Sequence, residues 1–275
     1  MSEISPNPEG KSEAAIAQPR PQAHVLYPSL LEVFRSLLSI LVVALFALTF
    51  LLQPFRIPSE SMEHTLLVGD FLLVNKMIYG TGLHLLPYRQ IQRGDIIVFH
   101  FPIDPSEHVV KRVIGIPGDR IRLVNGTVYR NGQAISEPYI ANEPSPPDAF
   151  RDQFPLHTYT DSSIDSHWWL DMRADVQNGE LIVPANSYFV LGDNRNHSRD
   201  SRYWGFVPRA NVEGRPFVIY FSLRRPSSTD IPEFPNTPSA RAASGNPGDK
   251  LRHENEAIDK VIDFARWDRI LRIVR

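Results

Sequence analysis

The sequence predicts a mostly β domain, preceded by one transmembrane helix and followed by an amphipathic helix. Three observations predict this fold class: a long uncharged apolar run, a series of short segments rich in Val, Ile, Phe and Tyr, and two Asn-Gly pairs between such segments. The chain has 275 residues and no cysteine, which excludes disulfides, zinc–thiolate sites and thiol nucleophiles. A net charge of −2 offers no basic field for nucleic-acid binding.

The first part of the chain predicts a tail and then a membrane span. Residues 1–28 are rich in proline and poor in large apolar side chains, which is typical of a disordered tail. Residues 36–55 carry no charge, and about 20 helical residues cross a hydrocarbon core of roughly 30 Å. We therefore assign 29–55 to a transmembrane helix. A cleavable signal peptide is disfavoured because no small-x-small site follows, and a buried core helix is the other alternative.

Residues 56–225 predict the β domain. Its strand-like runs are bounded by Gly, Asn, Asp and Pro, and two turns, Asn125-Gly126 and Asn131-Gly132, are typical of hairpins. The Pro-, Asp- and Ser-rich stretch 136–180 predicts an irregular insertion or subdomain.

The last part of the chain predicts a linker and a helix. Residues 226–254 are rich in Pro and Ser, and 255–275 form the predicted amphipathic helix, with Ile258, Val261 and Ile262 at helical spacing. Arginines follow them, so a membrane-surface helix and a helix docked on the domain or a partner both stay open.

Two serines follow the predicted span closely. Ser61 lies nine residues after Leu52, a distance of at most about 30 Å, so it must lie near the membrane surface. In an extended chain Ser59 and Ser61 point to the same face. This suits a nucleophile and an oxyanion donor, although the spacing alone favours two turn-forming serines.

A base for such a serine is available in a strand-like run, His108–Gly115. Both faces of this run are mixed, so periodicity does not decide whether Lys111 or Arg112 is buried. A solvated strand lysine is the usual case. Burial would lower the lysine pKa by up to about 3–5 units and create a neutral base near pH 7–8.

A third segment, Gly192–Arg202, follows an apolar strand and is crowded with turn formers and charges of both signs. Taken alone it predicts a solvated loop, a metal loop or a scaffold for ion pairs. Calcium is disfavoured because arginines interrupt the carboxylates.

Together these segments resemble bacterial type I signal peptidases, over about residues 36–222. The matching motifs follow the span in order: residues 58–62, 69–70, 94–99, 111–119, 192–202 and 204–205. The resemblance implies an antiparallel β catalytic core with an inserted smaller β region.

The resemblance also implies residue roles in a Ser–Lys serine protease. Ser61 would be the nucleophile and Lys111 the general base. The Ser61 amide and the Ser59 hydroxyl would form the oxyanion hole, and Ser198 would orient the lysine amine. Four residues would brace the site as ion pairs: Arg112, Asp193, Asp200 and Arg202. No cofactor and no metal is expected.

The expected partners are exported precursors carrying signal peptides and the lipid bilayer, with the export translocon nearby and no nucleic acid. The expected location is the bacterial cell (inner) membrane, single-pass, with the catalytic domain on the outer side. Charge supports this orientation only thinly, through Lys11, Arg20 and Arg35 before the span.

Two positions depart from the family pattern. His64 stands where the family commonly has proline, and His197 where a small polar residue is more frequent. His64 leaves open a Ser-His-Asp arrangement. Two further alternatives are a Ser–Lys self-cleaving repressor, disfavoured by the absence of a helix-turn-helix pattern, and a non-catalytic membrane-tethered β module.

Overall fold

The computed structural model describes residues 29–46, 49, 51–79, 89–141, 144–155, 162–224 and 264–274. The chain divides into two compact units, 1–44 and 45–275. The predicted tail (1–28) and linker (226–254) lie outside the described residues.

Helix α1, Leu30–Phe46, covers part of the predicted span and has no buried side chain. The described residues contain no helix with both the length and the apolar character that a membrane crossing needs, so the transmembrane helix over 29–55 is not confirmed. The prediction is wrong at its C-terminal end, because Leu52–Arg56 forms strand β1. Pro54 lacks the N–H that a helix interior uses, whereas β1 pairs with β2 (Asp70–Asn75).

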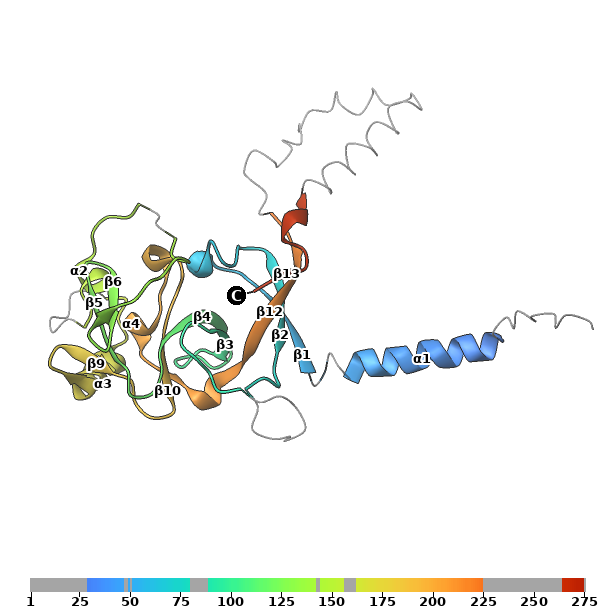
Figure 1. Ribbon diagram of the computed structural model, residues 1–275, viewed down its shortest axis with the longest axis horizontal. Helices are drawn as coiled ribbons and strands as arrows, with labels where there is room; N and C mark the ends of the chain where they lie inside the picture. Colours follow the sequence, from blue (N-terminus) through green and yellow to red (C-terminus); the bar gives the residue numbers. More distant parts are fainter. Residues whose placement is uncertain are drawn as a thin grey trace, which may run out of the picture. The chain divides into compact units, whose positions relative to one another are not determined.

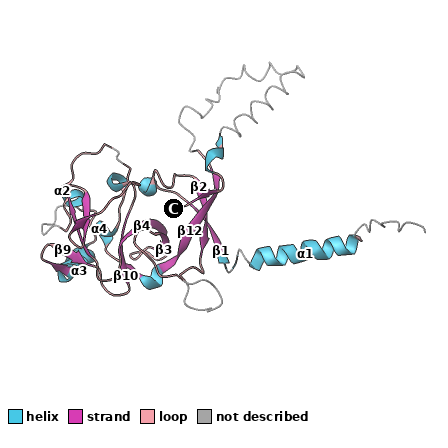
Figure 2. Cartoon of the chain, viewed as in Figure 1, coloured by secondary structure: helices cyan, strands magenta, loops and turns pink. Residues whose placement is uncertain are grey.

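The unit 45–275 is built on two antiparallel sheets (Figures 1 and 2). The larger sheet has the order β1–β2–β12–β3–β4–β10–β11, with β13 added beside β12. Its remaining strands are β3 (Ile96–His100), β4 (His108–Gly115), β10 (Ser187–Leu191), β11 (Val207–Pro208), β12 (Val212–Ser222) and β13 (Arg272–Ile273). The predicted antiparallel β architecture is confirmed for the described strands.

The smaller sheet is the inserted β region, in the order β7–β6–β5–β9–β8. Its strands are β5 (Arg120–Val124), β6 (Thr127–Arg130), β7 (Gln133–Ala134), β8 (Val176–Gln177) and β9 (Glu180–Ile182). Both predicted Asn-Gly turns are confirmed: they join β5 to β6 and β6 to β7, with positive φ at both residues of each pair.

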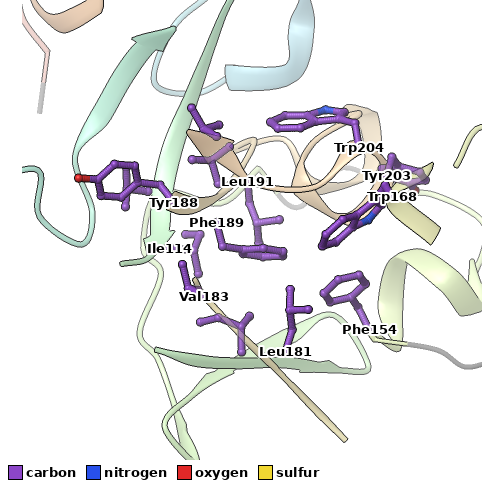
Figure 3. Packing of buried hydrophobic residues seen from close by; sticks show 14 of the residues in the cluster. Ile114, Phe154, Trp168, Leu181, Val183, Tyr188, Phe189, Leu191, Tyr203 and Trp204 are labelled. Carbon is purple, nitrogen blue, oxygen red and sulfur yellow. The ribbon is translucent and has the colours of Figure 1, made fainter. Parts of the chain in front are cut away.

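The stretch 136–180 holds more structure than its composition predicts. Its helices are α2 (Ala149–Asp152) and α3 (Ser166–Asp175), each capped by an aspartate that accepts a hydrogen bond from a backbone N–H. Phe154 and Trp168 from this stretch pack into the main hydrophobic core with Phe189 of β10 (Figure 3). The described part of 136–180 is therefore joined to the main core.

A second apolar cluster supports the segment that carries Ser61. The 3-10 helix η2, Glu60–Met62, buries Met62 against Leu66, Ile96 of β3 and Ile219 of β12. Three short helices complete the domain around β10 to β12: η3 (Arg195–His197), α4 (Ser201–Trp204) and η4 (Arg209–Asn211).

The C-terminal amphipathic helix over 255–275 is wrong for the residues that the structure describes there, 264–274; residues 255–263 lie outside them. This segment contains a 3-10 helix, η6 (Trp267–Arg269), and strand β13, which pairs with β12 at Val218 and Ile219. In Figure 1 the segment runs beside β12. Residues 272–273 form a strand because the edge of β12 offers hydrogen-bond partners to their backbone N–H and C=O groups.

Arg269 fixes this segment to the sheet. Its guanidinium binds both oxygens of Asp70, at 3.1 Å (Nε–Oδ1) and 2.6 Å (Nη2–Oδ2), and Asp70 also accepts from Ser222 Oγ at 2.6 Å. Both charges of the ion pair are buried. Bidentate pairing of this kind satisfies a carboxylate that has lost its water.

We predict that Arg269→Met lowers the free energy of unfolding by about 3–5 kcal/mol, because Asp70 is left buried without its counter-charge. Urea unfolding of the full chain measures this change. Arg272→Met removes an exposed arginine three residues away and is the matched control, expected within about 0.5 kcal/mol of wild type. Equal stability of the two variants would show that the pair does not hold the segment.

Candidate active site

Ser61 lies in η2, at the end of the segment that follows β1. Residue 59 has extended backbone angles (φ −124°, ψ 158°), and residues 60–62 then turn into the 3-10 helix. Ser59 Oγ and Ser61 Oγ are 3.4 Å apart, so the two predicted hydroxyls lie together. Ser61 itself is only 7% exposed.

Lys111 reaches the same point from β4. Its Nζ lies 2.5 Å from Ser61 Oγ and donates a hydrogen bond to it. The two residues are 50 positions apart in sequence, and the fold brings them into direct contact. Ser61 and Lys111 thus form the pair that a serine nucleophile and an amine base require.

Lys111 is buried in the part of β4 that pairs with β3, where Ile97 is its cross-strand partner. From Lys111 to Gly115 every residue of β4 is buried, which explains why periodicity did not separate Lys111 from Arg112. Desolvation by this burial lowers the pKa of Lys111 to about 8, with Asp200 and Asp193 raising it and Arg202 lowering it. The amine is therefore neutral in a large fraction of molecules near pH 8.

Lys111 differs from every other buried charged side chain that the structure describes. The others form ion pairs: Asp70–Arg269, Asp95–Arg89, Asp119–Arg93, Arg112–Asp193, Arg151–Asp152, Arg195–Glu137 and Arg202–Asp200. No carboxylate of a described residue forms a salt bridge with Lys111. An amine enclosed without a counter-charge favours its neutral form.

The four predicted bracing residues form two bidentate pairs. Arg112 donates to Asp193 at 2.8 and 2.7 Å, and Arg202 donates to Asp200 at 2.8 Å twice. Asp200 also accepts a hydrogen bond from the Gly192 amide at 3.1 Å. Burial raises the pKa of Asp200, but the charge and hydrogen bonds of Arg202 and the Gly192 amide outweigh it and leave this pKa below its usual range. The pairs hold the Gly192–Arg202 loop in a fixed shape. Their contribution to catalysis stays a prediction.

This loop touches the nucleophile segment directly. The Asn194 amide donates to the Ser61 carbonyl at 3.1 Å. A Cβ placed on Gly192 would clash with that carbonyl and with Ser198 Oγ, so only glycine allows this approach. The sequence places Gly192 and Asn194 in the predicted loop segment but predicts no role for either, because these contacts to the Ser61 carbonyl depend on the fold.

Ser198 and His64 differ in their position relative to Ser61. Ser198 is buried near Ser61 across Gly192, but its Oγ has no hydrogen-bond partner among the described residues, so its role of orienting Lys111 stays a prediction. His64 makes no hydrogen bond to Ser61; it lines a different cavity, with Thr65 and Tyr139. Nothing in the described geometry joins His64 to the nucleophile.

A cavity of about 230 Å³ opens beside Ser61. Its walls come from two segments, residues 55–62 and 107–110, so it lies between the end of β1 and the beginning of β4. Apart from Ser59 and Ser61, these lining residues are not predicted from the sequence, because only the fold brings the two segments together. Two more residues that were not predicted from the sequence support Arg112. Thr65 Oγ1 donates a hydrogen bond to Asp193, the partner of Arg112, at 2.5 Å, and the centroid of the Tyr139 ring lies 3.9 Å from the guanidinium carbon of Arg112.

The chain resembles known proteins over most of its length. Residues 30–221 match the family model described as signal peptidase, peptidase S26. A signal peptidase I of Pseudomonas fluorescens is 36% identical over 226 residues, covering 75% of this chain and 78% of that protein. A signal peptidase I of Leptolyngbya laminosa is 38% identical over 230 residues, covering 80% and 92%. A crystal structure of a signal peptidase I from Enterococcus faecalis V583 is 38% identical and covers 46% of this chain and 97% of that chain, with a TM-score of 0.35.

We predict that Lys111→Met stabilises the folded protein while removing the base. A pKa of about 8 in the folded state, against 10.5 for the free side chain, makes the unfolded state bind more protons between these pH values. Wild-type stability therefore rises with pH across this window, and the cost of burying the cation, about 3 kcal/mol, is present in full below pH 8.

The gain in unfolding free energy on Lys111→Met should be largest below pH 8 and should fade towards pH 10.5. Urea unfolding of wild type and variant across this range measures it. A difference that does not change with pH would contradict the lowered lysine pKa.

Proposed function

The chain belongs to the signal peptidase family, peptidase S26, and we propose that it is a membrane-bound serine endopeptidase that removes N-terminal signal peptides from exported precursors. Family membership makes it a signal peptidase enzyme. The observation that supports the proposed mechanism is the contact between Lys111 Nζ and Ser61 Oγ. Lys111 is buried and forms no salt bridge with a carboxylate of a described residue.

In the proposed reaction neutral Lys111 takes the proton of Ser61 Oγ as this oxygen attacks the scissile carbonyl. The Ser61 amide and the Ser59 hydroxyl stabilise the oxyanion; one such donor is typically worth about 10²–10³ in rate. The lysine ammonium then protonates the leaving amine, and water hydrolyses the acyl-enzyme. No metal or cofactor enters these steps.

Two free strand edges beside the cavity suit an extended substrate. β1 is the outermost strand of the larger sheet and, among the described strands, pairs only with β2. β10 pairs with β4 only from Arg112 onward, which leaves His108–Lys111 without a described strand on that side. A precursor segment can add its backbone hydrogen bonds at these edges, with small side chains in the cavity.

We also propose that the protein lies at the bacterial inner membrane as a single-pass protein, with its catalytic domain on the outer side. The apolar side chains of α1, among them Leu37, Ile40 and Leu41, are exposed and support burial in lipid. A precursor held by its own apolar segment in the same bilayer would gain effective concentration. The translocon that delivers it would lie nearby.

We predict that Lys111→Ala reduces cleavage of a signal-peptide-bearing precursor by at least about 10⁴-fold, because Ser61 loses its base. Ser61→Ala should be equally inactive, and both variants should keep the wild-type fold by circular dichroism. His64→Ala is the matched control and should keep most activity, since His64 makes no contact with Ser61. Cleavage is followed by gel electrophoresis of the precursor.

Two results would contradict this assignment. Wild-type cleavage by Lys111→Ala would exclude the Ser–Lys pair. Loss of activity in His64→Ala alone would favour a histidine base. A folded wild-type protein that cleaves no precursor and does not react with a serine-directed probe would point to the non-catalytic membrane-tethered module.

We predict that kcat/KM falls as the pH drops below about 8, approaching a tenfold loss for each pH unit. The reason is that only the neutral form of Lys111 accepts a proton, and its pKa in the free enzyme is about 8. Initial rates at a substrate concentration far below KM measure this limb. A profile that is flat from pH 6 to 9, or one with its midpoint near the pKa of about 6.5 typical of histidine, would be inconsistent with a lysine base.

A further inference from the structure

Three potential metal ligands from three neighbouring strands lie together, and neither Ser61 nor Lys111 is among them. His100 ends β3, His108 begins β4 and is its direct cross-strand partner, and Glu213 lies in β12, on the other side of β3. One ligand atom from each residue lies within 4.8 Å of the others. Two imidazoles and one carboxylate are a ligand set that binds zinc in proteins.

The bulge in β12 brings Glu213 to this point. The pairing of β12 with β3 shifts between Val212 and Gly214, so Glu213 is the extra residue of an irregular register. The ring centroids of His100 and His108 are 4.5 Å apart. The local backbone thus gathers the three side chains on one face.

The distances and hydrogen bonds favour a shared cation over a simple ion pair. His108 Nε2 and Glu213 Oε2 are 3.2 Å apart, close to the separation of about 3.3 Å between two ligands of a tetrahedral zinc ion. Yet Glu213 Oε2 is buried and accepts no hydrogen bond from a described residue. A cation between these atoms would satisfy the buried oxygen.

His100 is oriented as a metal ligand usually is. Its Nδ1 lies 2.9 Å from the Pro105 carbonyl oxygen, which can only accept, so Nδ1 carries the proton and the Nε2 lone pair is left for a metal. The Phe55 ring packs against the His108 ring, with their centroids 5.2 Å apart, and restricts its movement. Ligands fixed in advance lose little entropy on binding.

We propose that His100, His108 and Glu213 form a binding site for a divalent transition-metal ion such as Zn²⁺. The ion would cross-link β12, β3 and β4 at the strand end that also lines the cavity beside Ser61. Neither Ser61 nor Lys111 is one of its ligands. A water molecule would complete the coordination, since the three protein ligands leave the fourth position open.

The test is titration of the full-length chain, purified without a histidine tag and treated with chelator, with Zn²⁺ in a calorimeter. We expect wild type to bind one ion at this site and Glu213→Gln and His100→Ala each to bind it at least about tenfold more weakly. His167→Ala removes an exposed histidine of α3 and should bind as wild type does. Comparing variants separates this site from any other histidine of the chain.

Two further measurements test whether the ion binds to the folded protein at this site. Zn²⁺ should raise the Tm of wild type and of His167→Ala, and the rise should be reduced in Glu213→Gln and His100→Ala, because only an ion bound to the folded state stabilises it. Co²⁺ should give the visible absorption of a tetrahedral ion in wild type, and this band should be lost in both variants. Affinities and spectra unchanged in Glu213→Gln and His100→Ala, or no saturable binding to wild type, would overturn the proposal.

Discussion

The chemistry of the candidate site depends on one buried amine that has no counter-charge among the described residues. Lys111 is 3% exposed and touches Ser61, while the other buried charges of the described residues are neutralised in pairs. An ammonium in such a place is costly, so the protein holds a base that loses its proton far more readily than a lysine in water. The same burial that destabilises the folded protein therefore creates the reactive group, and the rest of the domain has to offset that cost.

The neighbouring ion pairs prevent further unpaired charges from adding to the cost of burying Lys111. Arg112 follows Lys111 in β4 and would add a second unpaired cation, but Asp193 binds it with both oxygens. Arg202 and Asp200 likewise neutralise each other within the loop that touches Ser61. Asp193 and Asp200 raise the lysine pKa and Arg202 lowers it, while burial remains the largest influence. Pairing thus fixes the loop while leaving the amine without a direct carboxylate contact.

The sequence predicted the local features well because each has a local cause. The two Asn-Gly turns follow from positive φ angles, the β4 strand from β-branched residues, and the signal peptidase family, which is confirmed, from motifs in a fixed order. The prediction of a C-terminal helix was wrong for the described residues because helical spacing of apolar residues does not reveal that an edge of β12 is free to pair with β13. The predicted membrane span extended too far towards the C-terminus because Pro54 lies in strand β1, which pairs with β2. The burial of Lys111, the cavity and the backbone contacts of Gly192 needed the fold, since they join segments far apart in sequence.

The position of Lys111 along β4 connects the base to its substrate. Arg112 is the first residue of β4 that pairs with β10, so Lys111 is the last residue of the free part of this strand edge. One position further along the chain, a lysine would lie where β10 covers the edge and no peptide could add there. Several positions earlier it would lie in the exposed beginning of β4, where water would keep the amine charged. Only at this boundary is the amine both desolvated by the sheet and adjacent to an edge that an extended peptide can occupy.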